Sequence, residues 1–412
     1  MQDIKSKKLK NGLSLIVAPD RRFPSAIFRF YLLAGSRMET KKNNGLVHLL
    51  EHLFAEKIKS RLADENGKTW ISSHIFKNFD AYTTKEYSEF SFDIHESDMP
   101  KALQVLATVI KKPDFTQEDL DREKGIIASE IDEAKDDFFK KIYQKVQKSY
   151  FGKSSLAMPV MGNVSNIIKF NLKEINSYYQ QIFNPKNICL TLGGSIDSST
   201  QKSAERLFGE LKPNAFSSIQ KWEKFTGRVG KITANNKEAK QTYYNLIYTI
   251  PAKSYQDRLF WQFLGEILHD YFNENIREKE AAIYSADLTL EEYREFLSLY
   301  ISFSVHPKKL AKIIRLVDVL LKNFAKNFRE EELLCAKNAY IKELDLDWTY
   351  PSSVTSMLGR QLALGVPSII DGKKETKLIK SIGRKKIINE LEGLVQSKGF
   401  RHITKSLYAK AN

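Results

Sequence analysis

Two histidines and a glutamate near the start of the chain could together do chemistry: His48, Glu51 and His52. Apolar residues recur around them at helical spacing, so we expect all three on one helix. A spacing of four residues puts both imidazoles on one face, where they can bind one zinc ion. Glu51 borders that face without having to bind the metal, which suits a general base. The pattern predicts a catalytic zinc site. The alternative is an amphipathic helix with solvent-facing histidines.

A tetrahedral catalytic zinc needs a third protein ligand and keeps its fourth position for water. Glu123 and Glu130 are the best candidates, in an acidic stretch with helical character. They are two helical turns apart and therefore face the same side. One of them can bind the metal while the other orients it, or orients a histidine. The alternative is the charged face of a solvated helix.

The elements that must position these residues follow from hydrophobic periodicity. Strand-like runs at 13–17 and 26–33 precede a helix from Gly45 to about Ile58, which Asn43 or Asn44 could cap. Further elements follow in the first half. They are a strand at 87–94, a helix at 100–110, one long helix from 117 to about 140, and a strand at 188–192.

The second half of the chain repeats features of the first. Residues 92–95 are echoed at 303–306, and residues 114–120 at 327–333, both at an offset of a little over 210 residues. Turn-forming residues at 211–218 indicate a linker. We therefore predict an α+β protein of two duplicated, α/β-sandwich-like domains of similar topology. Their predicted bounds are 1–212 and 219–412.

Composition excludes several classes of protein. The chain has 412 residues, of which 42% are hydrophobic, so it is too apolar for disorder and long enough for two domains. No stretch approaches the roughly 20 apolar residues of a membrane span. The net charge of +15 is spread among acidic residues, so we expect a solvated surface and no nucleic-acid partner. Two cysteines cannot form a disulfide framework, and we expect them to be buried in a cytoplasmic protein.

These motifs together resemble the pitrilysin/insulinase family of zinc metallopeptidases, in its short two-domain form. That family carries an inverted His-x-x-Glu-His motif followed by a glutamate about 75 residues later. The resemblance covers nearly the whole chain. Its further marks are the stretches 11–13, 35–39, 118–124, 178–179, 184–187 and 193–197.

The resemblance implies a zinc endopeptidase acting on unfolded or precursor peptides, with one Zn²⁺ per chain. His48, His52 and Glu130 would bind the metal, Glu51 would be the general base, and Glu123 would be the supporting glutamate. The repeat offset places Trp261, Leu264 and Gly265 where the second domain would need such a motif, so that domain lacks it.

The second domain instead carries Arg277 and Tyr284, seven residues apart. The resemblance implies that this pair binds the substrate carbonyl and stabilises the oxyanion. It also implies an edge strand that receives the peptide.

That edge strand corresponds to Asp80, Ala81, Tyr82 and Thr83. Asp80 replaces the family's usual asparagine. An ionised carboxylate cannot donate a hydrogen bond, so we expect an altered preference for substrate polarity.

Larger relatives join two such double-domain halves, whereas this chain carries both the zinc motif and the Arg277–Tyr284 pair. We therefore expect a homodimer in which each zinc site is completed by the opposite subunit, or alternatively a heterodimer with a paralogous chain. A different function is a non-catalytic scaffold subunit, but such relatives have lost the motif that is intact here. A third is nucleic-acid binding, for which the sequence has no motif.

Overall fold

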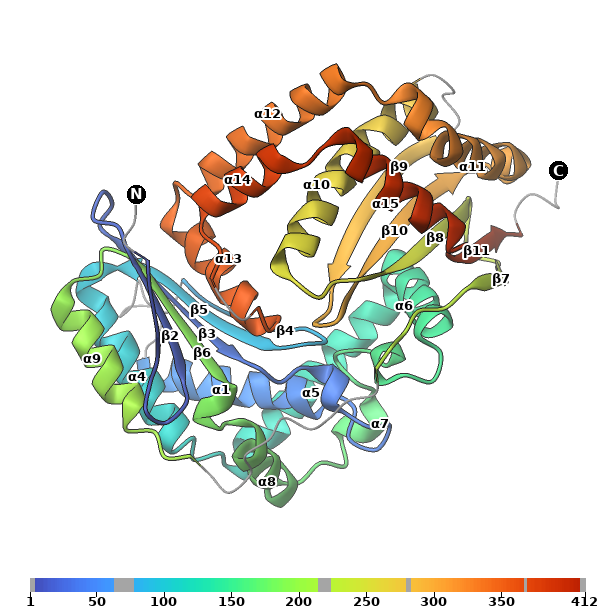
Figure 1. Cartoon of the computed structure of the whole chain (residues 1–412). Coiled ribbons are helices and arrows are strands. Elements are labelled where there is room, and N and C mark those ends of the chain that lie inside the picture. Colours follow the sequence, from blue (N-terminus) through green and yellow to red (C-terminus); the bar gives the residue numbers. More distant parts are fainter. Residues whose placement is uncertain (1–3, 63–77, 214–223, 279–282, 367–368, 408–412) are drawn as a thin grey trace. The chain divides into compact units, whose positions relative to one another are not determined.

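The computed structural model describes residues 4–62, 78–213, 224–278, 283–366 and 369–407 (Figure 1). Over these residues the chain divides into two compact units, each built on one β-sheet with helices against it. No helix in this part combines the length and the apolar character needed to cross a bilayer.

The first unit comprises Met1–Lys141, Ser154–Glu223 and Asp347–Ile369. Its described strands form one sheet in the order β1-β2-β6-β3-β5-β4. They are β1 (Lys5–Lys8), β2 (Ser14–Pro19), β3 (Ser25–Leu32), β4 (Phe79–Thr83), β5 (Ser88–His95) and β6 (Ile188–Gly194). β2 and β6 are parallel, and the other neighbours are antiparallel. The strands predicted in this half are confirmed to within two residues.

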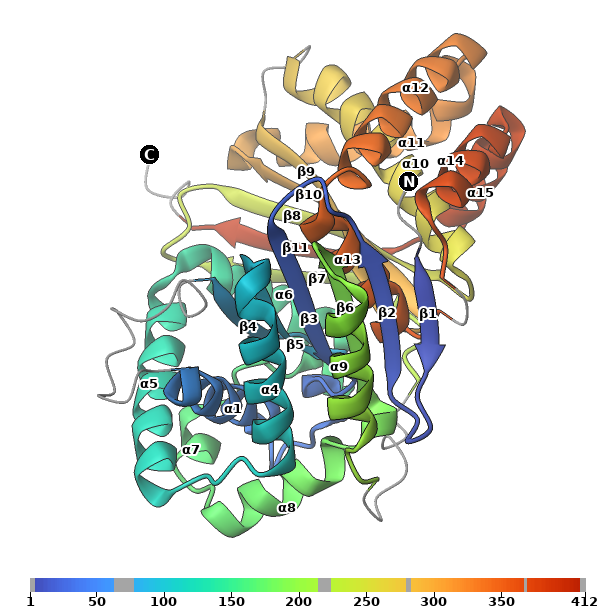
Figure 2. The same cartoon turned by 90° about the vertical axis from the view of Figure 1, so that its left-hand side faces the viewer.

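The helices of the first unit cover both faces of its sheet (Figure 2). They are α1 (Leu46–Leu62), α4 (Met99–Lys111), α5 (Gln117–Asp136), α7 (Val164–Ile167), α8 (Leu172–Ile182), α9 (Ser198–Gly209) and α13 (Pro351–Ala363), with a 3₁₀ turn η1 (Ser36–Met38). Phe28 and Phe30 of β3 point into the core shared with α1, α4, α8 and α9. Tyr31 points the other way, because side chains alternate along a strand, and it packs with Ala363 of α13. A Cβ at Gly359 would lie 2.0 Å from Tyr31 Cε2, so only glycine permits this approach.

The second unit comprises Ile142–Lys153, Lys224–Leu346 and Ile370–Asn412. Its described strands have the order β7-β11-β8-β10-β9. They are β7 (Gly230–Asn236), β8 (Thr242–Pro251), β9 (Ile283–Glu292), β10 (Phe296–Val305) and β11 (Phe400–Ser406). Its helices are α6 (Phe138–Phe151, from residue 142), α10 (Tyr255–Phe272), α11 (Leu310–Asn327), α12 (Glu330–Asp347), α14 (Gly372–Ser381) and α15 (Arg384–Gln396).

The two sheets have the same topology. The order β2-β6-β3-β5-β4 matches β7-β11-β8-β10-β9 strand by strand, and each sheet has its parallel pair at the same place. The echoed histidines also match. The His95 side chain, at the end of β5, accepts from the Ser97 N–H, and the His306 side chain, just after β10, accepts from the Lys308 N–H. This confirms the predicted α+β class and the duplicated topology.

The compact units do not follow the order of the sequence. Most of α6, from the first half of the chain, belongs to the second unit, where Gln147 Nε2 donates to Tyr300 Oη over 3.0 Å. α13, from the second half, belongs to the first unit, where Thr191 Oγ1 donates to the Thr355 carbonyl over 3.2 Å. The predicted domains 1–212 and 219–412 thus describe halves of the sequence. The linker predicted between them lies largely outside the described residues.

A predicted helix boundary and the predicted burial of one cysteine are wrong. The single helix expected from 117 to about 140 is two helices, because α5 ends at Asp136 and Asp137 is extended. The Asp137 carboxylate then accepts from the Lys140 N–H and so starts α6. Cys189 is buried as expected, but Cys335 is exposed on α12.

Candidate metal centre

Helices α1 and α5 pack together and carry all the predicted zinc-site residues of the first unit. α5 starts with a capping box between Thr116 and Asp119, which fixes its first turn. Asp119 also forms an ion pair with Lys57 of α1, with Nζ 2.5 Å from Oδ2. Burial raises the pKa of Asp119, but hydrogen bonds from Lys57 and Thr116 outweigh it and lower the pKa to about 2. The two helices are therefore tied together beside the site.

His48, His52 and Glu130 converge on one point. Each offers one ligand atom, and the three atoms lie within 4.8 Å of one another. The two imidazole rings are 4.6 Å apart between centroids, and His52 Nε2 lies 3.5 Å from a Glu130 oxygen. Two imidazoles and one carboxylate are a common donor set of catalytic zinc.

Glu123 contacts the other nitrogen of His52. Its Oε2 lies 3.2 Å from His52 Nδ1, so the ring donates its N–H to this buried carboxylate. That bond turns Nε2 toward Glu130 and raises the basicity of the ring, as a carboxylate behind a ligating histidine does. Burial lowers the pKa of His52, but Glu123, Glu51 and Glu130 together raise it above its ordinary value. The spacing alone did not say which glutamate binds the metal. In the structure Glu130 lies with the two histidines, and Glu123 lies behind His52.

His48 is buried, and it is neutral, as a histidine that binds a metal must be. Burial, with a smaller effect of the His52 charge, lowers its pKa to about 3, so the ring is neutral. Its Nδ1 is a buried polar atom with no hydrogen-bond partner among the described residues. A neutral imidazole beside a second imidazole and a carboxylate fits a zinc ion.

Glu51 lies beside these three residues. One of its oxygens is 3.9 Å from His48 Nε2 and accepts a hydrogen bond from Thr83 Oγ1 over 3.1 Å. Burial raises its pKa to about 7, against the opposing effects of His52 and Thr83.

The four residues predicted to receive the peptide form most of β4, which is an edge of the sheet among the described strands. Asp80 is exposed, and its carboxylate accepts from the Ala81 N–H. The Tyr82 side chain is 40% exposed, and its hydroxyl donates to Glu89 on β5. Thr83 faces Glu51, so this strand ends at the centre.

The residues predicted in the second half belong to the second unit. Arg277 is in a π-helical turn (Asn273–Glu278) and Tyr284 is in β9, but their side chains lie outside the described part of the structure. Helix α10 carries Trp261, Leu264 and Gly265, which are buried and pack in the interior of the second unit.

Sequence reasoning missed how α1 begins. Asn43 and Asn44 do not cap it: Asn43 Oδ1 accepts from Thr40, and Asn44 Nδ2 donates to Glu39. The backbone N–H groups of Gly45 and Val47 instead donate to Glu39. The sequence signal for this contact is Glu39 itself, an acidic residue before the helix. Glu39 lies too far from Leu46, the first residue of α1, for the usual capping rule to select it.

Two family models match most of the chain. Residues 18–164 match the one described as "Insulinase (Peptidase family M16)", and residues 169–340 match "Peptidase M16 inactive domain". The chain belongs to peptidase family M16. The expected relationship to the pitrilysin/insulinase family is therefore confirmed. The match to the model described as inactive begins in the first unit and continues into the second.

Relatives of this M16 chain include proteins named as zinc proteases. An "Uncharacterized zinc protease" of Rickettsia bellii is 25% identical over 363 residues, which cover 87% of each chain. One of Bacillus subtilis is 26% identical over 51% of each chain. The beta subunit of the mitochondrial-processing peptidase of Bos taurus is 26% identical over 49% of this chain and 41% of that protein.

Solved M16-like structures share the fold. A protease from Helicobacter pylori superposes with a TM-score of 0.83 at 16% identity, covering 98% of this chain and all of that one. The periplasmic protease PqqL from Escherichia coli gives a TM-score of 0.81 at 16% identity, covering all of this chain but 48% of PqqL. At such identities the likeness shows the fold alone.

Proposed function

We propose that this M16 chain is a zinc-dependent endopeptidase that hydrolyses unfolded or precursor peptides, with one zinc ion per chain. The observation that carries the proposal is the convergence of His48, His52 and Glu130, with one ligand atom each within 4.8 Å. The names of the relatives from Rickettsia and Bacillus support zinc protease activity.

The proposed chemistry assigns each residue of the centre one task. His48, His52 and Glu130 would hold a zinc ion, which would supply an acidified water and polarise the scissile carbonyl. The Glu51 carboxylate takes the proton from the attacking water and passes one to the leaving amine. Glu123 holds His52 in its ligating orientation through Nδ1.

The peptide is proposed to bind as an added strand along β4. A strand at a sheet edge presents unpaired main-chain groups, so affinity comes largely from backbone hydrogen bonds. Thr83 joins this strand to Glu51 through its hydroxyl, which supports a cleavage point near the end of the strand. The match to the mitochondrial-processing peptidase subunit supports precursor peptides as one substrate class.

Arg277 and Tyr284 are proposed to bind the substrate carbonyl and its oxyanion. Removing one such donor from an active site typically costs about 2.7–4 kcal/mol of transition-state stabilisation. We propose that the pair acts on the zinc site of a second subunit in a homodimer, or alternatively of a paralogous chain in a heterodimer.

The test is metal-dependent cleavage by the purified chain. The apo-protein, prepared by dialysis against a chelator, should cleave a library of unstructured peptides only after one equivalent of zinc is restored. Folded proteins should resist. Stoichiometric zinc binding with no cleavage of any peptide would favour the scaffold-subunit alternative.

A further inference from the structure

Glu39 lies at the start of the helix that carries both candidate zinc histidines. Its carboxylate accepts three hydrogen bonds: from the Val47 N–H over 2.7 Å, the Gly45 N–H over 3.0 Å and Asn44 Nδ2 over 2.9 Å. Val47 directly precedes His48. The first turn of α1, which would otherwise have unpaired donors, is therefore bound by one side chain from outside the helix.

This carboxylate is buried, and the proposed chemistry gives it no catalytic or metal-binding role. Glu39 is 3% exposed, and burial raises its pKa to about 7 against the opposing effect of its three donors. A buried carboxylate is costly unless it is hydrogen-bonded, and the positive end of a helix is a favourable place for it.

Glu39 is itself fixed to the turn that follows β4. Glu39 caps the end of η1, where its N–H donates to the Ser36 carbonyl over 3.1 Å. Arg37, in the same turn, forms a buried ion pair with Glu86 at 2.7 Å, and its N–H donates to the Lys85 carbonyl over 2.9 Å. Gly35 lies so close to this turn that a Cβ there would be 2.4 Å from the Lys85 carbonyl.

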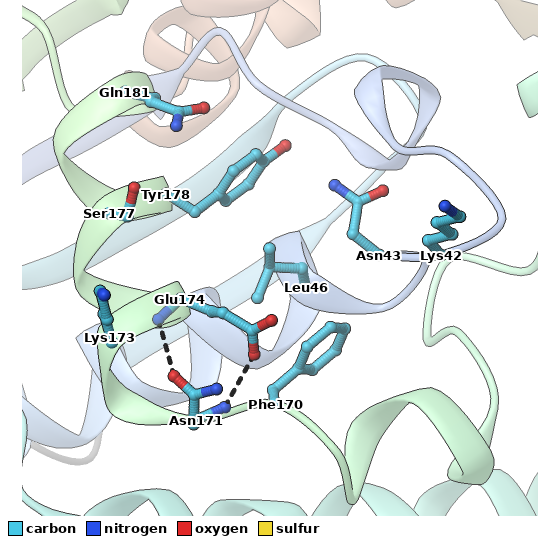
Figure 3. A pocket seen from close by; sticks show the side chains of 10 residues that line it. All are labelled: Lys42, Asn43, Leu46, Phe170, Asn171, Lys173, Glu174, Ser177, Tyr178 and Gln181. Atoms are coloured by element: carbon cyan, nitrogen blue, oxygen red, sulfur yellow. Dashed lines mark hydrogen bonds between the residues drawn. The ribbon is translucent and has the colours of Figure 1, made fainter.

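Leu46 is buried in the core at the start of α1 and also borders a pocket. Leu46, the first residue of α1, lines a pocket of about 590 Å³ together with Asn43 and residues of α8 (Figure 3). The Tyr178 ring extends from α8 across this pocket toward Asn43. Core packing of Leu46 and the hydrogen bonds to Glu39 therefore act together to fix the first turn.

We propose that Glu39 is a positioning residue of the zinc centre. Its carboxylate sets the start of α1, and with it His48 and His52, relative to the turn that ends the candidate substrate strand β4. The inference rests on the proposed zinc function, because it assigns Glu39 a role in how well the ligands meet the metal.

The test compares zinc binding in Glu39→Gln with that in the wild type. Glutamine keeps the shape but loses the charge and one acceptor oxygen. Zinc affinity, measured by competition with a chelator, should fall about 10–100-fold, as is typical when a group supporting metal ligands is changed. The visible absorption bands of the Co²⁺-substituted protein should also change, because they report the coordination geometry. Asn44→Ala removes one donor to the carboxylate and the bond from Asn44 Nδ2 to the Pro159 carbonyl, and its zinc affinity should lie between those of the wild type and Glu39→Gln.

Leu207→Ala is the matched control, since it truncates a buried side chain of α9 in the same core without touching α1's first turn. It should lower thermal stability and leave zinc affinity within about twofold. The inference is overturned if Glu39→Gln and Asn44→Ala bind zinc as the wild type does. It is also overturned if Leu207→Ala, at a loss of thermal stability equal to that of Glu39→Gln, loses as much zinc affinity as Glu39→Gln does. Failure of the wild type to bind zinc would instead refute the proposed function.

If Glu39→Gln does not fold, the zinc affinity and the Co²⁺ spectrum of Asn44→Ala test the inference. Weaker zinc binding with an altered Co²⁺ spectrum then supports the inference, and wild-type values overturn it.

Discussion

Thr83 of β4 donates a hydrogen bond to the Glu51 carboxylate of α1, with 3.1 Å between Oγ1 and Oε2. Thr83 is also 3.0 Å from Ser88 Oγ on β5, so its hydroxyl is held at the junction of strand and helix. A peptide added to the edge of β4 would therefore end beside the residue proposed to activate water. Thr83 would then link the strand that binds the substrate to Glu51, the residue that transfers the proton.

Glu51→Gln should abolish peptide cleavage and leave zinc bound. The amide can still accept the Thr83 hydrogen bond, but it cannot take a proton from water, and loss of a general base typically costs about 10²–10⁴-fold. Turnover of a fluorogenic peptide and metal content by elemental analysis are measured on the same sample. Near-wild-type turnover would show that Glu51 is not the base.

Glu130→Gln and Glu123→Gln should distinguish a residue that binds zinc from one that orients a zinc ligand. The first removes a proposed ligand and should give largely metal-free protein after dialysis. The second should retain part of the zinc and lose about 10–100-fold in affinity or activity. Glu133→Gln, an exposed residue on the same helix, is the control and should behave as the wild type. Full zinc content in the Glu130 variant would point to another third ligand, with Glu133 the first to examine.

The parts of the fold and site that the sequence could predict are those set by local spacing. His48 and His52 lie four residues apart on one helix, so their convergence follows from helix geometry. The same holds for Glu123 and Glu130 on α5, and strand alternation located β3 and β5. The duplicated topology followed from echoed segments.

The parts that it could not predict depend on contacts distant in sequence or on a single residue. The hydrogen bond of Thr83 to Glu51 spans 32 residues. Glu39 reaches the start of α1 from outside the helix, past two asparagines that local rules favour as caps. At Asp137, one side chain that can cap a new helix broke a pattern whose periodicity continued across it.

Asp119→Asn should destabilise the protein at neutral pH, and the difference from the wild type should shrink in acid. The folded-state pKa of Asp119 is lowered to about 2, below its ordinary value of 3.8. Its contribution is therefore complete above pH 4 and is lost as the pH falls toward 2. We expect up to about 1 kcal/mol less stability at pH 7, because the substitution removes the charge that pairs with Lys57 and accepts from Thr116. Thermal or urea unfolding at pH 7, 5, 4 and 3 tests this, and a constant difference at all pH values would contradict it.

Mixing two inactive variants should restore activity if the proposed homodimer shares its sites. Glu51→Gln lacks the base and Tyr284→Phe lacks the proposed oxyanion donor, so each is inactive alone. After dissociation and reassociation, about half the dimers are mixed and each has one complete site, which gives roughly a quarter of wild-type activity. No recovery despite proven subunit exchange would place Tyr284 with the zinc site of its own chain, or with a different partner.

The exchange of α6 and α13 between the sequence halves has a consequence for how the chain can be divided. A fragment of residues 1–212 lacks α13, so Ile16, Ala18 and Tyr31 would lose the cover of Val354, Leu358 and Ala363. A fragment of residues 219–412 lacks α6 and its bonds to Glu291 and Tyr300. We expect each fragment to aggregate when expressed alone, and the pair to be recovered as one folded complex when co-expressed. The two repeats, although each has a complete sheet, are then obligate partners: the duplicated protein can be cut into two chains but not into two independent proteins.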